Sequence, residues 1–141
     1  MNRIYWDTML FVYLLEADPQ FGPRVGEIYK EMMLRGDVLC TSIFTVGEVL
    51  VGPQKSGGAE VVARLKNYFA RDEVDLIALT MEMAEHYSRI RAAHGVSPAD
   101  AIHLASAAQS RTDLFLTNDR KLLRLNIPGI SFIAGLDAKI F

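Results

Sequence analysis

The chain has 141 residues, of which half are hydrophobic and 23% are charged, and its formal net charge is −2. This length predicts one domain, residues 1–141, with enough residues for a real core, and the near-neutral charge neither favours nor excludes a nucleic-acid partner. The longest apolar run, residues 9–15, is far too short to span a bilayer, and the first residues lack a signal-peptide core, so we expect no membrane partner. The single cysteine, Cys40, precludes an internal disulfide and suits a reducing compartment, which predicts a cytoplasmic protein with Cys40 in its core.

Short apolar stretches alternate with helical patterns along the chain. Strand patterns occupy residues 3–6, 38–41, 74–78 and 114–117, with a last edge strand at 131–134. Helical patterns occupy residues 8–15, 21–35, 59–71, 80–94, 97–108 and 120–125. Residues 43–51 are predicted to be helical, although their β-branched content leaves a strand open, and residues 52–58 are predicted to form a flexible loop. This alternation predicts an α/β fold of three layers, in which helices cover both faces of a short central parallel sheet.

Four acidic residues occupy positions where the side chains of such a fold converge. Asp7 and Asp119 each follow a strand directly, and Asp100 opens the helix that Ser97 caps. Glu48 is the only charged residue between positions 38 and 54. Taken singly, each acid has a simpler interpretation: Asp7 and Asp100 are typical helix-capping acids, and Glu48 is typical of a side chain that faces water.

A shared pocket for these four carboxylates predicts a bound cation. Like charges at short range do not all stay ionised without a countercharge, and oxygen ligands without a Cys or His cluster suit Mg²⁺ or Mn²⁺ rather than Zn²⁺. Without the cation, repulsion is expected to raise the pKa values of the carboxyl groups. Asp7→Asn and Glu48→Gln are then expected to stabilise the metal-free protein.

Four short blocks of sequence together resemble one known family. They are YWDT at residues 5–8, TVGEV at 45–49, PADAIHLA at 98–105 and LTND at 116–119. In this order and spacing the chain, from Ile4 to about Ile133, resembles the PIN-domain ribonucleases, and most closely the VapC-like toxins of bacterial and archaeal toxin–antitoxin pairs. The resemblance implies a PIN-like fold with Asp7, Glu48, Asp100 and Asp119 as the catalytic, metal-binding acids.

The same resemblance implies an activity and partners. It implies a hydrolase that uses Mg²⁺ or Mn²⁺ to cleave RNA phosphodiester bonds and leaves a 5′-phosphate and a 3′-hydroxyl. It also implies a homodimer and an antitoxin protein that lays a helix in a groove and places a basic side chain near the acids. The supporting residues that we predict by their place in the matching blocks are Thr8, Thr117 and Asn118.

Other residues have two interpretations each. Arg120, Lys121 and Arg124 either hold RNA phosphates or form a solvated helix face. His103 is interpreted as a core or interface residue rather than a metal ligand, because the predicted donors are hard oxygens. The apolar content of residues 11–14 and 21–34 exceeds what one small core needs, which predicts a buried assembly face.

Two other functions remain open from the sequence. One is a non-catalytic RNA-binding or regulatory domain of the same fold, which metal-dependent cleavage of RNA would exclude. The other is a small α/β phosphatase or phosphotransfer enzyme in which Asp7 is the phosphorylated nucleophile. Met9 disfavours the second, because haloacid-dehalogenase-like enzymes carry a second Asp at that position.

Overall fold

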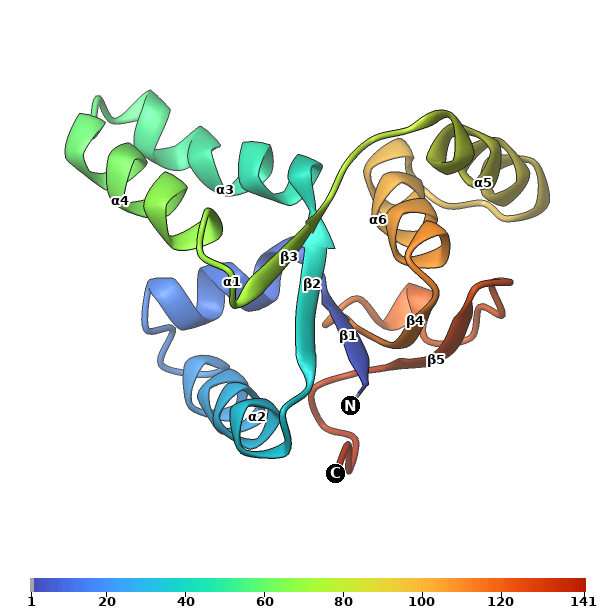
Figure 1. The fold of residues 1–141 in the computed structure, drawn as a ribbon, viewed down its shortest axis with the longest axis horizontal. Helices are drawn as coiled ribbons and strands as arrows, with labels where there is room; N and C mark the ends of the chain where they lie inside the picture. The colour runs from blue at the N-terminus through green and yellow to red at the C-terminus, as the bar shows by residue number, and fades with distance from the viewer. Residues whose placement is uncertain (1) are drawn as a thin grey trace.

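A fully parallel sheet of five strands, in the order β3-β2-β1-β4-β5, forms the centre of the computed structural model, which describes residues 2–141 (Figure 1). Tyr5 lies at the middle of the sheet, opposite Cys40 of β2 on one side and Phe115 of β4 on the other. The predicted parallel sheet is therefore confirmed. The strands are β1 (Arg3–Trp6), β2 (Val38–Ser42), β3 (Val74–Ile77), β4 (Thr112–Leu116) and β5 (Ile130–Ala134).

Helices cover both faces of this sheet, which confirms the three-layer α/β/α prediction (Figure 1). Side chains of α5 and α6 pack on one face in a core cluster with Tyr5, whereas side chains of α1 and α2 pack on the other with Trp6. Because neighbouring residues of a strand point to opposite faces, Tyr5 and Trp6 enter different layers. The helices are α1 (Thr8–Leu15), α2 (Gly22–Arg35), α3 (Ile43–Lys55), α4 (Ala59–Phe69), α5 (Met81–Ala93) and α6 (Pro98–Gln109).

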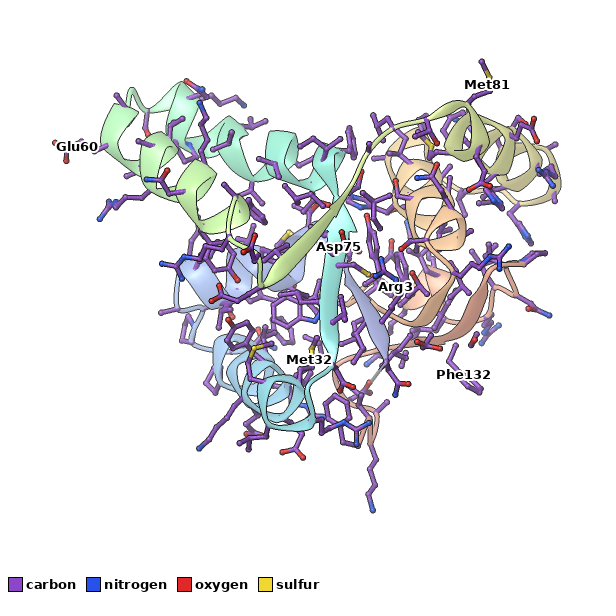
Figure 2. The ribbon with its side chains drawn as sticks, viewed as in Figure 1. Arg3, Met32, Glu60, Asp75, Met81 and Phe132 are labelled. Atoms are coloured by element: carbon purple, nitrogen blue, oxygen red, sulfur yellow. The ribbon has the colours of Figure 1, made fainter. Side chains whose placement is uncertain are left out.

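One ion pair joins two strands of the sheet, and other side chains point outward (Figure 2). Arg3 of β1 and Asp75 of β3 form an ion pair of 2.7 Å between Nη2 and Oδ2. Glu60 and Met81 point away from the sheet near the starts of α4 and α5, and Phe132 of the edge strand β5 is 73% exposed. Exposed side chains thus lie outside the buried core.

The third helix corrects one prediction. Residues 52–55 were expected in a loop, but α3 runs through Gly52 and Pro53 to Lys55, and the open alternative of a strand at residues 43–51 is wrong. Pro53 sits in the last turns, where its missing N–H removes only one helical hydrogen bond. Beyond it, Ser56 N–H still donates to Gly52 O (3.1 Å) and Gly58 N–H to Pro53 O (2.9 Å), so the turn closes.

A second correction concerns residues 120–125, which were predicted to be helical. Only a short 3₁₀ helix, η1 (Arg120–Leu122), forms there. Hydrogen bonds of the three-residue type continue beyond it, from Leu123 N–H to Arg120 O (3.3 Å) and from Leu125 N–H to Leu122 O (3.2 Å). The segment therefore winds too tightly for an α-helix.

The core accounts for several apolar residues that looked superfluous. Phe11 is fully buried, and Tyr13 and Leu14 pack against the same core cluster. In α2 the side chains of Val25, Ile28 and Met32 are also buried, whereas Leu34 is 74% exposed. Part of the predicted assembly face is therefore core, whereas Tyr13 and Leu14 are only partly buried and Leu34 is exposed.

Two further observations concern Cys40 and the lengths of the helices. Cys40 is buried, as predicted, and burial raises the pKa of its thiol to about 12, so the thiol stays protonated at neutral pH. Within residues 2–141, no helix has both the length and the apolar character that a bilayer crossing requires.

Candidate functional site

All four acids that the sequence singles out line one pocket of about 300 Å³. Asp7 follows β1, Asp119 lies just after β4, Glu48 belongs to α3 and Asp100 to the first turn of α6. The pocket therefore lies at the carboxyl ends of the central strands, where parallel α/β sheets bind ligands. The other lining residues are Thr8, Met9, Tyr13, Ala99, His103 and Asn118.

Asp7 occupies the N-cap position of α1, but its side chain caps nothing. Its backbone is tied to the neighbouring strand end by a bond from its N–H to Leu116 O (3.1 Å), and no capping bond reaches its carboxylate. Instead Oδ2 accepts a hydrogen bond from Thr117 Oγ1 (2.7 Å). The capping interpretation therefore does not explain why an acid stands here.

Thr117 joins two of the acids. Its side chain is fully buried, donates to Asp7, and accepts a bond from the backbone N–H of Asp119 (3.0 Å). Asp119 in turn accepts from Lys121 N–H through Oδ1 (3.0 Å), which caps η1. A threonine after β4 thus orients one carboxylate directly and the other through its backbone.

Glu48 does not simply face water. Its side chain is 32% exposed, and its Oε1 contacts both Thr8 Oγ1 (2.5 Å) and His103 Nε2 (2.7 Å). Burial alone raises the pKa of this carboxyl group, but the hydrogen bonds from His103 and Thr8 outweigh burial, so the pKa lies below its usual value. The expectation that repulsion raises the pKa of Glu48 is therefore wrong, because these two donors favour the ionised form.

Asp100 behaves as the sequence predicts. The Ser97 side chain caps α6 by accepting from Asp100 N–H (3.1 Å), and Asp100 lines the pocket. Burial, followed by the negative charges of Asp119 and Asp7, raises the pKa of Asp100 above its usual value. The neighbouring carboxylates therefore add to an effect on Asp100 of which burial is the largest cause.

Sequence reasoning missed the bond between His103 and Glu48. His103 lies one turn after Asp100 on α6, its side chain is 3% exposed, and its Nε2 is 3.9 Å from Asp7 Oδ1. The spacing of three residues put His103 on the same helix face as Asp100, and this was the available signal. It was not decisive, because a histidine among apolar residues is also typical of a core.

The donors in the pocket suit a hard divalent cation. They are carboxylate oxygens, and a cation would offset both the burial and the neighbouring negative charges that raise the pKa of Asp100. Among residues 2–141, however, no three His, Cys, Asp or Glu side chains stand in a ready-made ligand arrangement. Mg²⁺ keeps several waters and needs only one or two carboxylates, so the donor set still fits it.

The predicted RNA-binding residues lie at the border of this pocket. Arg120, Lys121 and Arg124 are exposed, and none of them forms an ion pair with another residue in the range 2–141. Arg120 lines a second pocket of about 320 Å³, which shares Asn118 with the acidic pocket. Asn118 itself donates to Tyr13 Oη (3.1 Å).

Fold and pocket together define a parallel α/β domain with an acidic site at the carboxyl ends of its strands. The sequence matches the model of the PIN domain family over residues 4–128, and the chain therefore belongs to the PIN domain family. The comparison with curated proteins finds no match.

Solved structures share the fold along nearly the whole chain. A chain of the Rickettsia felis VapBC2 complex, bound to a promoter DNA fragment, is similar with a TM-score of 0.71 and 17% identity, covering 94% of this chain and 98% of that one. A toxin–antitoxin complex from Klebsiella pneumoniae has a TM-score of 0.65, 21% identity and coverage of 90% and 94%. Mycobacterium tuberculosis VapC20, described as a sarcin-ricin loop cleaving toxin, has a TM-score of 0.63, 17% identity and coverage of 79% and 86%. At these identities the likeness is one of fold, and that fold is VapC-like.

Proposed function

We propose that this protein is a metal-dependent ribonuclease that hydrolyses RNA phosphodiester bonds and acts as the toxin of a toxin–antitoxin pair. The observation that carries this proposal is the meeting of Asp7, Glu48, Asp100 and Asp119 in one pocket of a PIN-family fold. The named functions of the structurally similar proteins support the toxin assignment.

The four carboxylates are the proposed metal ligands and catalytic residues. A bound Mg²⁺ or Mn²⁺ would polarise the scissile phosphate and lower the pKa of the attacking water. Thr117 keeps Asp7 in one orientation, and Thr8 does the same for Glu48, so both carboxylates enter the reaction preorganised. A carboxylate that is not engaged with the cation accepts the proton of the attacking water.

RNA is held outside the acidic pocket. Arg120, Lys121 and Arg124 are exposed cations that follow Asp119 in the sequence, and their proposed role is to bind phosphates on either side of the scissile bond. The pocket that Arg120 lines shares Asn118 with the acidic one, and we expect it to accommodate a flanking nucleotide. These contacts supply affinity, whereas the acids supply the chemistry.

The proposal includes two protein partners and a compartment. The cognate antitoxin neutralises the enzyme by binding beside the pocket, and the toxin itself is a homodimer. The toxin–antitoxin complexes that share the fold support the antitoxin partner, and the homodimer is a further part of the proposal. The cytoplasm, where RNA and a reduced Cys40 coexist, is the proposed location.

RNA cleavage by the purified protein tests the enzymatic proposal. We expect cleavage with Mg²⁺ or Mn²⁺, none with EDTA, and a loss of at least 100-fold in Asp7→Asn, because the amide is a poorer metal ligand, on the order of the losses known for catalytic groups. Asp72→Asn, an acid that is exposed outside the pocket, is the matched control and should cleave at the parent rate. Parent-rate cleavage by Asp7→Asn would refute the site.

The same samples separate the alternatives. A protein that binds RNA but never cleaves it, with either metal, is a binding domain and not a nuclease. A stable acyl-phosphate on Asp7 after incubation with a phosphate monoester would instead assign a phosphotransfer enzyme.

A further inference from the structure

Two buried side chains that are not among the proposed metal ligands are linked by hydrogen bonds to Glu48. Tyr5 is fully buried in β1, and His103 is 2% exposed in α6. Tyr5 Oη is 2.7 Å from His103 Nδ1, and His103 Nε2 is 2.7 Å from Glu48 Oε1. A chain of hydrogen bonds therefore runs from the centre of the sheet to the pocket.

The partners in this chain assign its protons. The backbone N–H of Ser42 donates to Tyr5 Oη (3.3 Å), so the Tyr5 hydroxyl proton is free to point at His103. In the tautomer that carries its hydrogen on Nε2, Nδ1 accepts this proton. That N–H donates to the carboxylate of Glu48, which leaves every polar group of the pair with a partner.

The bonds leave the two oxygens of Glu48 in different situations. Oε1 receives hydrogen bonds from both Thr8 and His103, whereas Oε2 makes no hydrogen bond to any residue in the range 2–141. A carboxylate anchored through one oxygen presents the other in a fixed direction. Because Glu48 lines the acidic pocket, the free oxygen is the one available to a cation.

We propose that His103, locked by Tyr5 as the Nε2–H tautomer, is a positioning residue that fixes the carboxylate of Glu48 for divalent-cation binding. The inference rests on the proposed function, because it assigns a cation to that pocket. It adds a residue pair whose effect passes through Glu48 and not through contact with the substrate. Partners of this kind orient metal ligands, and their loss typically weakens metal affinity by about 10–100-fold.

Calorimetric titration of the metal-free proteins with Mn²⁺ provides the test. His103→Leu keeps similar bulk but removes both nitrogens, and we expect a Kd at least about tenfold weaker. His103→Gln restores an N–H at a similar reach, and we expect its Kd to return to within about threefold of the parent. His86→Leu, a histidine on α5 outside the pocket, controls for the loss of a surface metal ligand and should match the parent.

A second readout does not depend on metal or activity. In nitrogen-15 spectra of the metal-free protein, the His103 ring should show the Nε2–H tautomer, and Tyr5→Phe should convert it to a mixture, because Nδ1 loses its donor. All measurements are made at a temperature where circular dichroism shows each variant folded. If His103→Leu does not fold, the tautomer of the parent and the Tyr5→Phe spectrum still decide whether Tyr5 locks His103.

The outcomes separate this inference from the proposed function. Parent-like Mn²⁺ affinity in His103→Leu, together with a lost affinity in Asp7→Asn, overturns the positioning role and leaves the metal site standing. A parent that binds no Mn²⁺, or an Asp7→Asn variant that binds it normally, overturns the proposed function and this inference with it. An Nδ1–H tautomer in the parent overturns the lock by Tyr5.

Discussion

Glu48 and Asp100 line the same pocket, but their surroundings act on their carboxyl groups in opposite directions. His103 and Thr8 donate to Glu48 and lower its pKa, whereas burial and the charges of Asp119 and Asp7 raise the pKa of Asp100. By linkage, ionised Glu48 stabilises the fold above its unfolded pKa, and this contribution is lost as the pH falls through the native pKa. Ionised Asp100 destabilises the metal-free fold at neutral pH. Protonated Asp100 stabilises the fold at low pH, and this stabilisation is lost as the pH rises through the native pKa of Asp100.

Amide variants of these two acids should therefore shift stability in opposite directions. In EDTA at pH 7, we expect Glu48→Gln to lower the free energy of unfolding by about 1 kcal/mol, on the order of 2–5 °C in melting temperature, because the charge-assisted bonds are weakened. Asp100→Asn should raise it by about 1 kcal/mol or less, since the group is partly solvated. Calorimetry measures both, with Asp72→Asn as the unshifted control; shifts of equal sign would contradict this account.

The sequence predicted the four acids but not the residues that contact them. Strand ends, a capped helix start and an isolated charge indicated Asp7, Asp119, Asp100 and Glu48, and the structure brings them to one pocket. The sequence could not indicate that His103, 55 residues after Glu48, donates a hydrogen bond to Glu48, because that contact depends on how α3 and α6 meet. Their catalytic roles stay predictions.

Gly129 lies in the turn between η1 and β5, and its backbone packs against the C-terminal end of α6. Its φ is +100°, and a Cβ there would lie 2.7 Å from the Ala108 carbonyl oxygen. Both the backbone conformation and the close approach therefore require glycine. No sequence pattern beyond Pro128-Gly129 as a turn signal shows this contact, because Ala108 is far away along the chain.

Alanine substitutions separate the two requirements at Gly129. We expect Gly129→Ala to destabilise the protein by about 2 kcal/mol or more, on the order of 5–10 °C, because strain and overlap add. Gly57→Ala has a positive φ of 71° but open space, and should cost about 1 kcal/mol. Gly95→Ala has neither constraint and should leave the melting temperature unchanged. A Gly129→Ala variant as stable as Gly95→Ala would show that the turn rearranges freely.

The elements that were mispredicted share a physical cause. Gly-Pro and Gly-Gly are statistical turn signals, but the end of α3 keeps its backbone partners despite Pro53, so the helix continues. Residues 120–125 carry a helical pattern, yet the cap that Asp119 provides tightens the first turn into η1. In both places local hydrogen bonds decided the outcome, and residue type alone does not show them.

For the whole molecule, periodicity predicted the layers and the parallel sheet but not the strand order. The order β3-β2-β1-β4-β5 follows from long-range pairings, such as Tyr5 with Phe115, that no local pattern contains. The assembly also needed the structure. Phe11 of α1 was assigned to an assembly face but is fully buried. Leu34 of α2 is the most exposed apolar residue of the segments assigned to that face.

Light scattering tests the proposed homodimer. We expect a mass about twice the 15.7 kDa of one chain at micromolar concentration. Leu34→Glu should shift the mass toward the monomer, since a charge in an apolar interface is costly, whereas Met81→Glu on the distant α5 should not. A parent that stays monomeric at high micromolar concentration would contradict the dimer.

The central place of β1 also governs when the pocket comes into being during synthesis. A ribosome produces β1, Asp7 and Glu48 early, yet the strand that must flank β1 follows more than 100 residues later, roughly 5–20 s at ordinary translation rates. Until then β1 lacks one neighbour, Asp7 lacks Thr117, and Asp119 does not exist. A nascent or prematurely terminated chain therefore carries no assembled acidic pocket. If the finished protein is toxic as proposed, its own translation is harmless until nearly the last strand is made.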